Sequence, residues 1–360
     1  MIRNSIFERN CINFLFKVKL LLLEELAKII KLTTYTNIIK KIFSAHDAVS
    51  FNETALEIFQ YQYQNNLVYN KFCHLLGKSP LNVNQIETIP FLPVEFFKKL
   101  KVVTGEKPIE IVFKSSATTG MSQSYHHVSD LSIYKKSYLK SFELFYGKPS
   151  DYCILALLPS YMEREGSSLV FMIDDLVKKS KNRNSGFYLH NTGDLIDRIK
   201  IQEAKAQKTL LIGVTFALIN LAEKCKLDLK TTIVMETGGM KGRRKEMIRE
   251  EVHEILSNAF EVSKIHSEYG MTELLSQAYS AGNGFFKCPP WMKVMIRDAH
   301  DPLTYIGNNK GGGINIIDFA NINSCSFIST QDLGKSHPDG SFEVLGRFDN
   351  SDIRGCNLLA

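Results

Sequence analysis

The alternation of short apolar runs with helical stretches, which begins near residue 110, constrains the fold of this chain more than any other feature of its sequence. Apolar runs of the buried-strand type span Ile154 to Leu158, Thr209 to Val214 and Thr232 to Met235. Helical patterns follow the second and third runs, at Ala217 to Lys224 and Lys245 to Leu256. Strands that alternate with helices predict an α/β core with a parallel sheet.

The segments on either side of this alternation extend the prediction. Ile109 to Phe113 is typical of a strand that enters a turn rich in serine and threonine, and Ser132 to Phe145 is typical of a helix. From about residue 291 the pattern becomes β-rich, with candidate strands at Met292 to Ile296 and Ile314 to Phe319. Pro338-Asp339-Gly340 is a strong turn signal and predicts a hairpin near the end of the chain.

Residues 1 to about 100 have a mainly helical pattern. Ser50 and Glu53 have the spacing of a capping box, which predicts a helix that starts there and continues to about Leu76, before Gly77. The prolines at positions 90 and 93 then favour an extended connector. We therefore expect three regions: a helical region at 1–100 that packs on the core, an α/β core at 101–345 and a hinge-like tail at 346–360.

Composition excludes several classes of protein. The chain has 360 residues, of which 44% are hydrophobic and 23% charged, so it can bury a core without disulfides or a structural metal. A net charge of +6 without a clustered basic face argues against a nucleic-acid partner. The seven cysteines are scattered and form no CxxC pair, which favours a reducing cytoplasm over a disulfide framework.

The N-terminal segment is apolar from Phe14 to Leu23, but Lys17 and Lys19 interrupt it. A signal peptide needs an unbroken apolar stretch, and a membrane-spanning helix needs about 20 apolar residues, so neither is predicted. We expect a helix that runs to about Leu32 and packs on the protein. A helix that contacts a membrane surface is the alternative.

A turn rich in hydroxyl groups follows the first predicted strand of the core, at Ser115-Ser116-Ala117-Thr118-Thr119-Gly120. Its O–H and backbone N–H donors, in a backbone made flexible by the glycine, are suited to wrap a polyphosphate. A polar surface turn without a ligand is the alternative.

The segment Ser267-Glu268-Tyr269-Gly270-Met271-Thr272-Glu273 also combines groups that suit a bound nucleotide. Gly270 lets the backbone pass close to a ligand, Thr272 offers a hydroxyl group, and Glu273 offers a carboxylate for a hard cation such as Mg²⁺. The alternative is a loop that caps a following helix, with Glu273 in the first turn of that helix.

Two further segments complete the set. Gly238 and Gly239 follow a predicted strand, where a planar ligand can lie against bare backbone. Asp332 is suited to accept hydrogen bonds from ribose hydroxyl groups, and Arg347 to neutralise phosphate. Each residue type is commonplace alone, so it is their joint order along the chain that indicates a nucleotide site.

In this order and spacing the segments resemble the motifs of the adenylate-forming superfamily, which includes acyl-CoA synthetases and luciferases. The resemblance implies the large N-terminal domain of that fold, with strand–helix layers and a β-rich C-terminal part, lacking the small C-terminal lid domain. It implies ATP and Mg²⁺ as cofactors. The resemblance implies that Thr272 and Glu273 are catalytic and that Glu273 is the Mg²⁺ ligand. The residues that it implies bind the nucleotide are Ser115, Ser116, Thr118, Thr119, Gly120, Gly238, Gly239, Tyr269, Gly270, Met271, Asp332 and Arg347.

A closer resemblance is to the LuxE-type acyl-protein synthetases, the fatty-acid-activating component of bacterial bioluminescence. It rests on Ile89 to Lys98 and Leu158 to Ser168, which are similar to two stretches of that family. It implies a cytoplasmic long-chain fatty acid–protein ligase that forms an acyl-adenylate. The acyl group then passes to Cys356 as a thioester, for delivery to a partner acyl reductase.

Two departures from the superfamily pattern keep other functions open. Ala117 stands where the family's loop usually has glycine, and Ser122 and Gln123 stand where the superfamily has a basic residue, a place that Lys114 or His126 can take. One alternative is a ligase of the phenylacetate-CoA ligase type, which uses coenzyme A or a carrier protein. The other is a catalytically eroded assembly subunit that binds acyl-adenylate.

Overall fold

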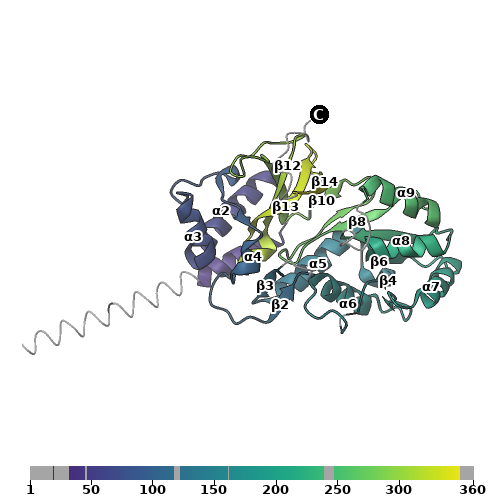
Figure 1. Cartoon of the computed structure of the whole chain (residues 1–360). Helices are drawn as coiled ribbons and strands as arrows, with labels where there is room; N and C mark the ends of the chain where they lie inside the picture. Colours follow the sequence, from purple (N-terminus) through teal and green to yellow (C-terminus); the bar gives the residue numbers. More distant parts are fainter. Residues whose placement is uncertain are drawn as a thin grey trace, which may run out of the picture. The chain divides into compact units, whose positions relative to one another are not determined.

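A computed structural model of the chain describes residues 19, 32–44, 47–116, 122–160, 162–238 and 247–348 (Figure 1). The chain divides into two compact units, Met1–Ser44 and Ala45–Ala360. In the first unit, residues 32–42 form a helix. Among the residues described, no helix is long and apolar enough to cross a membrane. The second unit contains the sheet and all the segments predicted to bind a nucleotide that the structure describes.

A twelve-stranded sheet runs through the second unit in the order β11-β12-β13-β14-β10-β9-β8-β7-β6-β4-β5, with β1 paired to β13. Neighbours from β5 to β8 are parallel. These strands are β4 (Cys153–Leu157), β5 (Gly186–Phe187), β6 (Thr209–Val214), β7 (Thr232–Thr237) and β8 (His266–Tyr269). The predicted α/β core with a parallel sheet is therefore confirmed.

Helices alternate with the parallel strands, as predicted. They are α5 (Leu131–Tyr146), α6 (Ser168–Ser180), α7 (Thr192–Ala204), α8 (Thr215–Lys224) and α9 (Arg249–Phe260). Every residue of β4 and β6 is buried, which is expected of parallel strands covered by helices on both faces. This double coverage explains why these strands are continuous apolar runs in the sequence rather than alternating patterns.

The C-terminal part of the sheet is antiparallel, which confirms the predicted β-rich region. Its strands are β9 (Ala278–Ser280), β10 (Phe286–Lys287), β11 (Met292–Arg297), β12 (Gly311–Asp318), β13 (Phe327–Ser336) and β14 (Phe342–Arg347). Strands β13 and β14 form the predicted hairpin, with Ser336 paired to Phe342. Gly340 in the turn has φ +80°, a conformation that glycine adopts at little cost.

The first helix of the second unit starts earlier than predicted and is interrupted. Helix α2 spans Ala48–Asn65, and the side chain of Asp47, rather than that of Ser50, caps it by accepting a bond from the Ser50 backbone N–H. Asn66 has extended backbone angles and caps the next helix, α3 (Leu67–Leu75). The predicted end is confirmed, because Gly77 follows with φ +64°.

A short connector and a separate hairpin lead from these helices into the core. The connector contains η1 (Ile86–Thr88), β1 (Leu92–Pro93) and α4 (Phe96–Lys99). Strands β2 (Ile111–Lys114) and β3 (Tyr125–Val128) pair with each other in a two-stranded sheet. The Ser/Thr-rich turn joins them, and residues 117–121 of that turn lie outside the described residues. The remaining short helices are η2 (Pro149–Asp151) and η3 (Phe319–Asn323).

Two adjacent glycines of β12 provide a test of the sheet packing. A methyl group at Gly312 would lie 2.2 Å from the Arg297 backbone oxygen, whereas one at Gly311 meets nothing closer than Leu345 Cδ1 at 3.9 Å. We predict that G312A lowers the free energy of unfolding by about 1–3 kcal/mol, as overpacking does. We predict that G311A changes it by less than about 0.5 kcal/mol. Urea unfolding measures both, and equal effects would contradict the packing described.

Candidate active site

The candidate site lies at the carboxyl ends of three neighbouring parallel strands. Thr215 follows β6, Gly238 follows β7 and Gly270 follows β8. In open α/β sheets, ligands bind outside the carboxyl ends of the strands. The sheet therefore brings together two of the segments that the sequence predicts to contact a nucleotide, although they are separated by the whole of α9.

Tyr269 and Asp332, which the resemblance implies bind the nucleotide, are bonded to each other. The Tyr269 hydroxyl donates to Asp332 Oδ2 at 2.8 Å, and Arg347 Nε donates to Asp332 Oδ1 at 3.1 Å. Asp332 and Arg347 are opposite each other on β13 and β14. The Asp332 side chain is only 9% exposed while that of Arg347 is 75% exposed, so the guanidinium lies at the solvent side of the pair.

The Tyr269 ring is enclosed by aromatic residues. Its centroid lies 5.9 Å from that of Phe286 and 5.6 Å from that of Phe342, both with tilted or edge-on geometry. Burial, together with the Asp332 carboxylate, raises the pKa of Tyr269 well above its usual value. The tyrosine hydroxyl is therefore protonated at neutral pH and can donate a hydrogen bond.

Glu273 is connected to the base of the Ser/Thr-rich turn. Its side chain is buried, and the Ser124 side chain is close enough to lower its pKa against the larger effect of burial. Ser124 in turn donates its backbone N–H to Ser115 Oγ at 2.9 Å, and its carbonyl accepts the Ser115 N–H at 3.1 Å. Burial raises the pKa of Glu273. The carboxylate predicted to bind Mg²⁺ and the turn predicted to bind phosphate are thus neighbours.

His126 holds the segment that contains Thr272. Its Nδ1 lies 2.9 Å from the Thr272 carbonyl oxygen and its Nε2 lies 2.9 Å from Ser324 Oγ. Burial lowers the pKa of His126 to about 4, so the ring is neutral at physiological pH. His126 is consequently a link between β3 and the Thr272 backbone and not the positive charge missing from the turn. Lys114, the other candidate for that charge, is exposed at the end of β2.

Further side chains hold the backbone after Glu273. Asn321 Nδ2 donates to the Glu273 carbonyl oxygen at 2.7 Å. The buried Asp318 carboxylate accepts the backbone N–H groups of Leu275 and Ser276 at 3.0 and 2.9 Å, and the Ser276 hydroxyl at 2.6 Å. The next element is strand β9, so the alternative in which this loop caps a helix is wrong.

The sequence predictions missed His126 as a support, and missed Asn321, Asp318 and Ser124 altogether. Their partners are mostly backbone atoms far away in the sequence, and no local pattern signals such pairs. The structure describes Ser115, Ser116, Gly238, Gly270 and Met271 at the turn and at the strand ends. The other predicted residues, Thr118, Thr119, Gly120, Gly239 and Cys356, lie outside the described residues.

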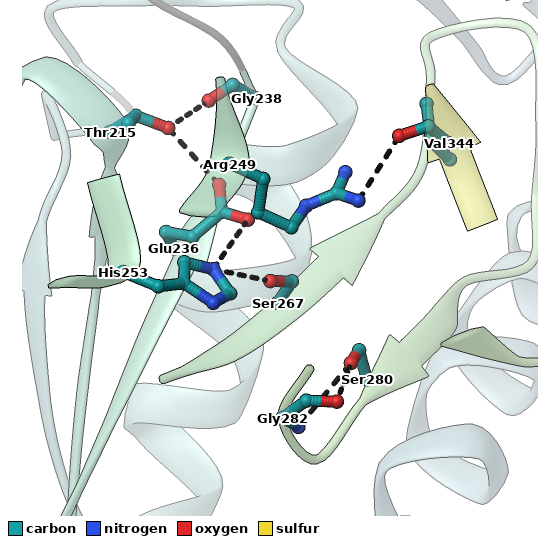
Figure 2. A network of polar contacts seen from close by, with 9 residues as sticks. All are labelled: Thr215, Glu236, Gly238, Arg249, His253, Ser267, Ser280, Gly282 and Val344. Carbon is teal, nitrogen blue, oxygen red and sulfur yellow. Dashed lines mark hydrogen bonds and ion pairs between the residues drawn. The ribbon is translucent and has the colours of Figure 1, made fainter. Parts of the chain in front are cut away.

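Gly238 is held by a polar network beneath the strand ends (Figure 2). The Thr215 hydroxyl bonds to the Gly238 carbonyl oxygen and lies 3.0 Å from Glu236 Oε2. His253 Nε2 on α9 lies 3.4 Å from Ser267 Oγ and 3.9 Å from Glu236 Oε1. Gly238 has φ +66°, a conformation that favours glycine. The network fixes the backbone at the point where a planar ligand is predicted.

Comparisons with known proteins address the family resemblance and the fold. The family model for the acyl-protein synthetase LuxE matches residues 42–154 of the 360. No curated protein matches the chain in sequence. The predicted resemblance to LuxE-type proteins is therefore confirmed for the matched segment, which contains α2, α3, the β2–β3 hairpin and α5.

Solved structures share the fold. ATP-bound MatB from Rhodopseudomonas palustris is 17% identical, with a TM-score of 0.51, and the match covers 68% of this chain and 49% of MatB. A 2-hydroxyisobutyryl-CoA ligase in the postadenylation state, in complex with 2-HIB-AMP, is 12% identical, with a TM-score of 0.61, and the match covers 85% of this chain and 69% of the ligase. The chain spans about half the length of MatB. Over the matched parts the chain has the fold of these two ligases, which agrees with the predicted α/β fold.

The buried His126 provides a pH test of the loop support. At pH 7.5, H126Q should cost about 1–3 kcal/mol of unfolding free energy, because it breaks two buried hydrogen bonds. Between pH 6.5 and about 4 the unfolded histidine is protonated and the folded one is neutral, so the wild type loses stability as the pH falls. The difference in unfolding free energy between the wild type and H126Q should therefore become smaller as the pH falls over that range.

The measurement is urea unfolding at pH 7.5, 6 and 5, with H190Q as control because the His190 side chain is 72% exposed. H190Q should have the same unfolding free energy as the wild type at each pH. If the difference in unfolding free energy between the wild type and H126Q does not change with pH, His126 has the same pKa in the folded and unfolded chains, which would contradict the prediction.

Proposed function

We propose that this chain activates a carboxylic acid with ATP. A carboxylate oxygen attacks the α-phosphorus, the bond to the β-phosphate oxygen breaks, and pyrophosphate leaves, so that an acyl-adenylate forms. The observation that supports this best is the convergence of segments distant in sequence: Tyr269 bonds to Asp332, and Glu273 lies beside Ser124 at the base of the Ser/Thr-rich turn. Reactions of this type depend on positioning and charge neutralisation, which such a site supplies.

Each described group has a role in this proposal. Tyr269 and the backbone at Gly238 hold the adenine, and Asp332 accepts the ribose hydroxyl groups once the nucleotide takes the place of the Tyr269 hydroxyl. Arg347, exposed beside Asp332, contributes positive charge near the phosphates. The turn from Ser115 to Gly120 holds the β- and γ-phosphates through its hydroxyl and N–H groups.

The residues fit a bound Mg²⁺. Mg²⁺ in nucleotide sites is held by one or two carboxylates together with substrate phosphates, and Glu273 supplies one carboxylate next to the phosphate-binding turn. The described residues contain no group of three or more side chains that could hold a metal by themselves, in keeping with a metal that needs the nucleotide. When bound, Mg²⁺ neutralises charge on the phosphates.

The second step of the proposal passes the acyl group to Cys356. The thiolate attacks the acyl carbon and AMP leaves, which gives a thioester on the protein. The described thiols are poor candidates, because burial raises the pKa of Cys73 and Cys288 to about 12 and that of Cys153 to about 11, and raises it for Cys225 and Cys325 as well. Thiolates rather than thiols are nucleophilic. The likeness to the LuxE model suggests a long-chain fatty acid, a cytoplasmic setting and a reductase partner that receives the acyl group.

Acid-dependent exchange of labelled pyrophosphate into ATP tests the first step. With tetradecanoate as the acid, we predict exchange by the wild-type chain and at least a 100-fold loss in E273A, in line with the loss of an electrostatic group at a reacting phosphate. E254A is the control, because Glu254 is exposed on α9. Equal exchange by E273A and the wild type would contradict the role of Glu273.

Labelling of the protein by radioactive tetradecanoate and ATP tests the second step. We predict that C356S keeps pyrophosphate exchange but loses the covalent label, whereas C225S keeps both. Full labelling of C356S would refute the acceptor. Release of a soluble thioester on addition of coenzyme A to C356S would favour the second candidate, an acyl-CoA ligase.

A further inference from the structure

A basic surface lies at the edge of the sheet opposite the candidate site. Strands β8, β7, β6, β4 and β5 are neighbours in this order and run parallel, so the segments that lead into them meet at one edge, at the amino ends of the strands (Figure 1). Because neighbouring strands are about 4.8 Å apart, this edge, hereafter the entry edge, is about 20 Å wide. The five segments are residues 147–152, 181–185, 205–208, 225–231 and 261–265.

The entry edge has an excess of positive charge. Its five segments contain eight basic and three acidic residues, all of them exposed. The basic residues are Lys148, Lys181, Arg183, Lys205, Lys208, Lys226, Lys230 and Lys264, and the acidic ones are Asp151, Asp228 and Glu261. The excess of five is close to the net charge of the whole chain, +6. The sequence shows no basic cluster because these residues are far apart in it, and the parallel sheet gathers them.

Ion pairs neutralise little of this charge. Of the residues that the structure describes, only Asp228 forms an ion pair with one of the eight, Lys230. The helix dipole favours cations at the end of a helix, which explains Lys181 and Lys205, the C-caps of α6 and α7. The other six basic residues come after the caps, and the effect of the dipole falls off within the last turn. The charge of the entry edge is therefore more than helix capping requires.

Two features of the entry edge favour a lipid surface as its partner. Seven of the eight basic residues are lysines, whereas nucleic-acid recognition favours the planar guanidinium of arginine. Two aliphatic side chains also lie in the last turns of helices that end there, Leu144 of α5 at 56% exposed and Ile201 of α7 at 40% exposed. Lysines beside exposed aliphatic groups suit a bilayer, where the charges meet anionic headgroups and the aliphatic groups enter the acyl boundary.

We propose that the entry edge docks on an anionic lipid bilayer. Clusters of about four to eight basic residues bind such surfaces through the negative potential of the headgroup layer, and the attraction is screened by salt. The candidate site is at the carboxyl ends of the same strands, so it faces away from the bilayer and stays open to solutes. This inference goes beyond the proposed activity and does not depend on it.

Flotation of the full chain with lipid vesicles tests the docking. One set of vesicles contains phosphatidylglycerol and phosphatidylcholine in equal parts, and the other contains phosphatidylcholine alone. At about 0.05 M NaCl we predict a bound fraction about tenfold or more higher on the anionic vesicles. At about 0.5 M NaCl the two bound fractions should agree to within about twofold, because salt screens exposed charges.

Charge reversal locates the contact. The variant K181E/R183E/K205E/K208E should lose the preference for anionic vesicles, and the neutral variant K181Q/R183Q/K205Q/K208Q should reduce it by about threefold or more. The control K71E/K99E/K287E/K310E changes the net charge equally at exposed lysines outside the entry edge and should keep at least about half of the preference. Urea unfolding checks that each variant is folded.

The outcomes decide the proposal. A wild-type chain that binds both kinds of vesicle alike overturns it. Equal loss of binding in the entry-edge variant and the control also overturns it, because net charge and not this edge would then be responsible. Tighter binding to a DNA duplex of about 20 base pairs than to the anionic vesicles, lost in the same variant, assigns the edge to nucleic acid and overturns the lipid partner. None of these outcomes depends on acyl-adenylate formation.

Discussion

The candidate site depends on the hydrogen bonding of one irregular loop. Residues 270–273 leave β8 without entering a helix and run from the exposed Gly270 to the buried Glu273, and backbone groups that leave the surface must find partners. The partners are side chains from distant elements: His126 for the Thr272 carbonyl, Asn321 for the Glu273 carbonyl, and Asp318 for the N–H groups that follow. Because His126 belongs to β3, these bonds also fix the Ser/Thr-rich hairpin against Glu273. The loop therefore joins the Ser/Thr-rich hairpin, which we propose binds phosphate, to the sheet.

Successive side chains of β7 and β8 point to opposite faces of the sheet. Glu236 and Ser267 point to the α9 face and meet His253, whereas Thr237 and Glu268 point to the α5 face. Tyr269, which bonds to Asp332, is on the first side, so the residues proposed to hold the nucleoside share one face of the sheet with His253.

Much of the fold could be predicted from the sequence, because fully buried strands such as β6 are continuous apolar runs with sharp ends. Strand β8 was not predicted as a strand: its sequence, His-Ser-Glu-Tyr, has no apolar pattern, and its polar side chains are buried only because Thr237 and His253 receive them. The start of α2 was misplaced since Asp47, three residues before Ser50, reaches the Ser50 N–H. The motif residues of the site were predicted, but their supports were not, since Asp318 and Asn321 act on backbone atoms more than 40 residues away.

The central claim is that the strand ends of β7 and β8 hold an acyl-adenylate across the sheet edge. A crystal structure with tetradecanoyl-sulfamoyl-adenosine, a stable analogue of such an intermediate, tests it directly. The account predicts the ribose within hydrogen-bond distance of Asp332 and the sulfamate group beside Glu273. An analogue bound away from the carboxyl ends of β7 and β8 would contradict the account.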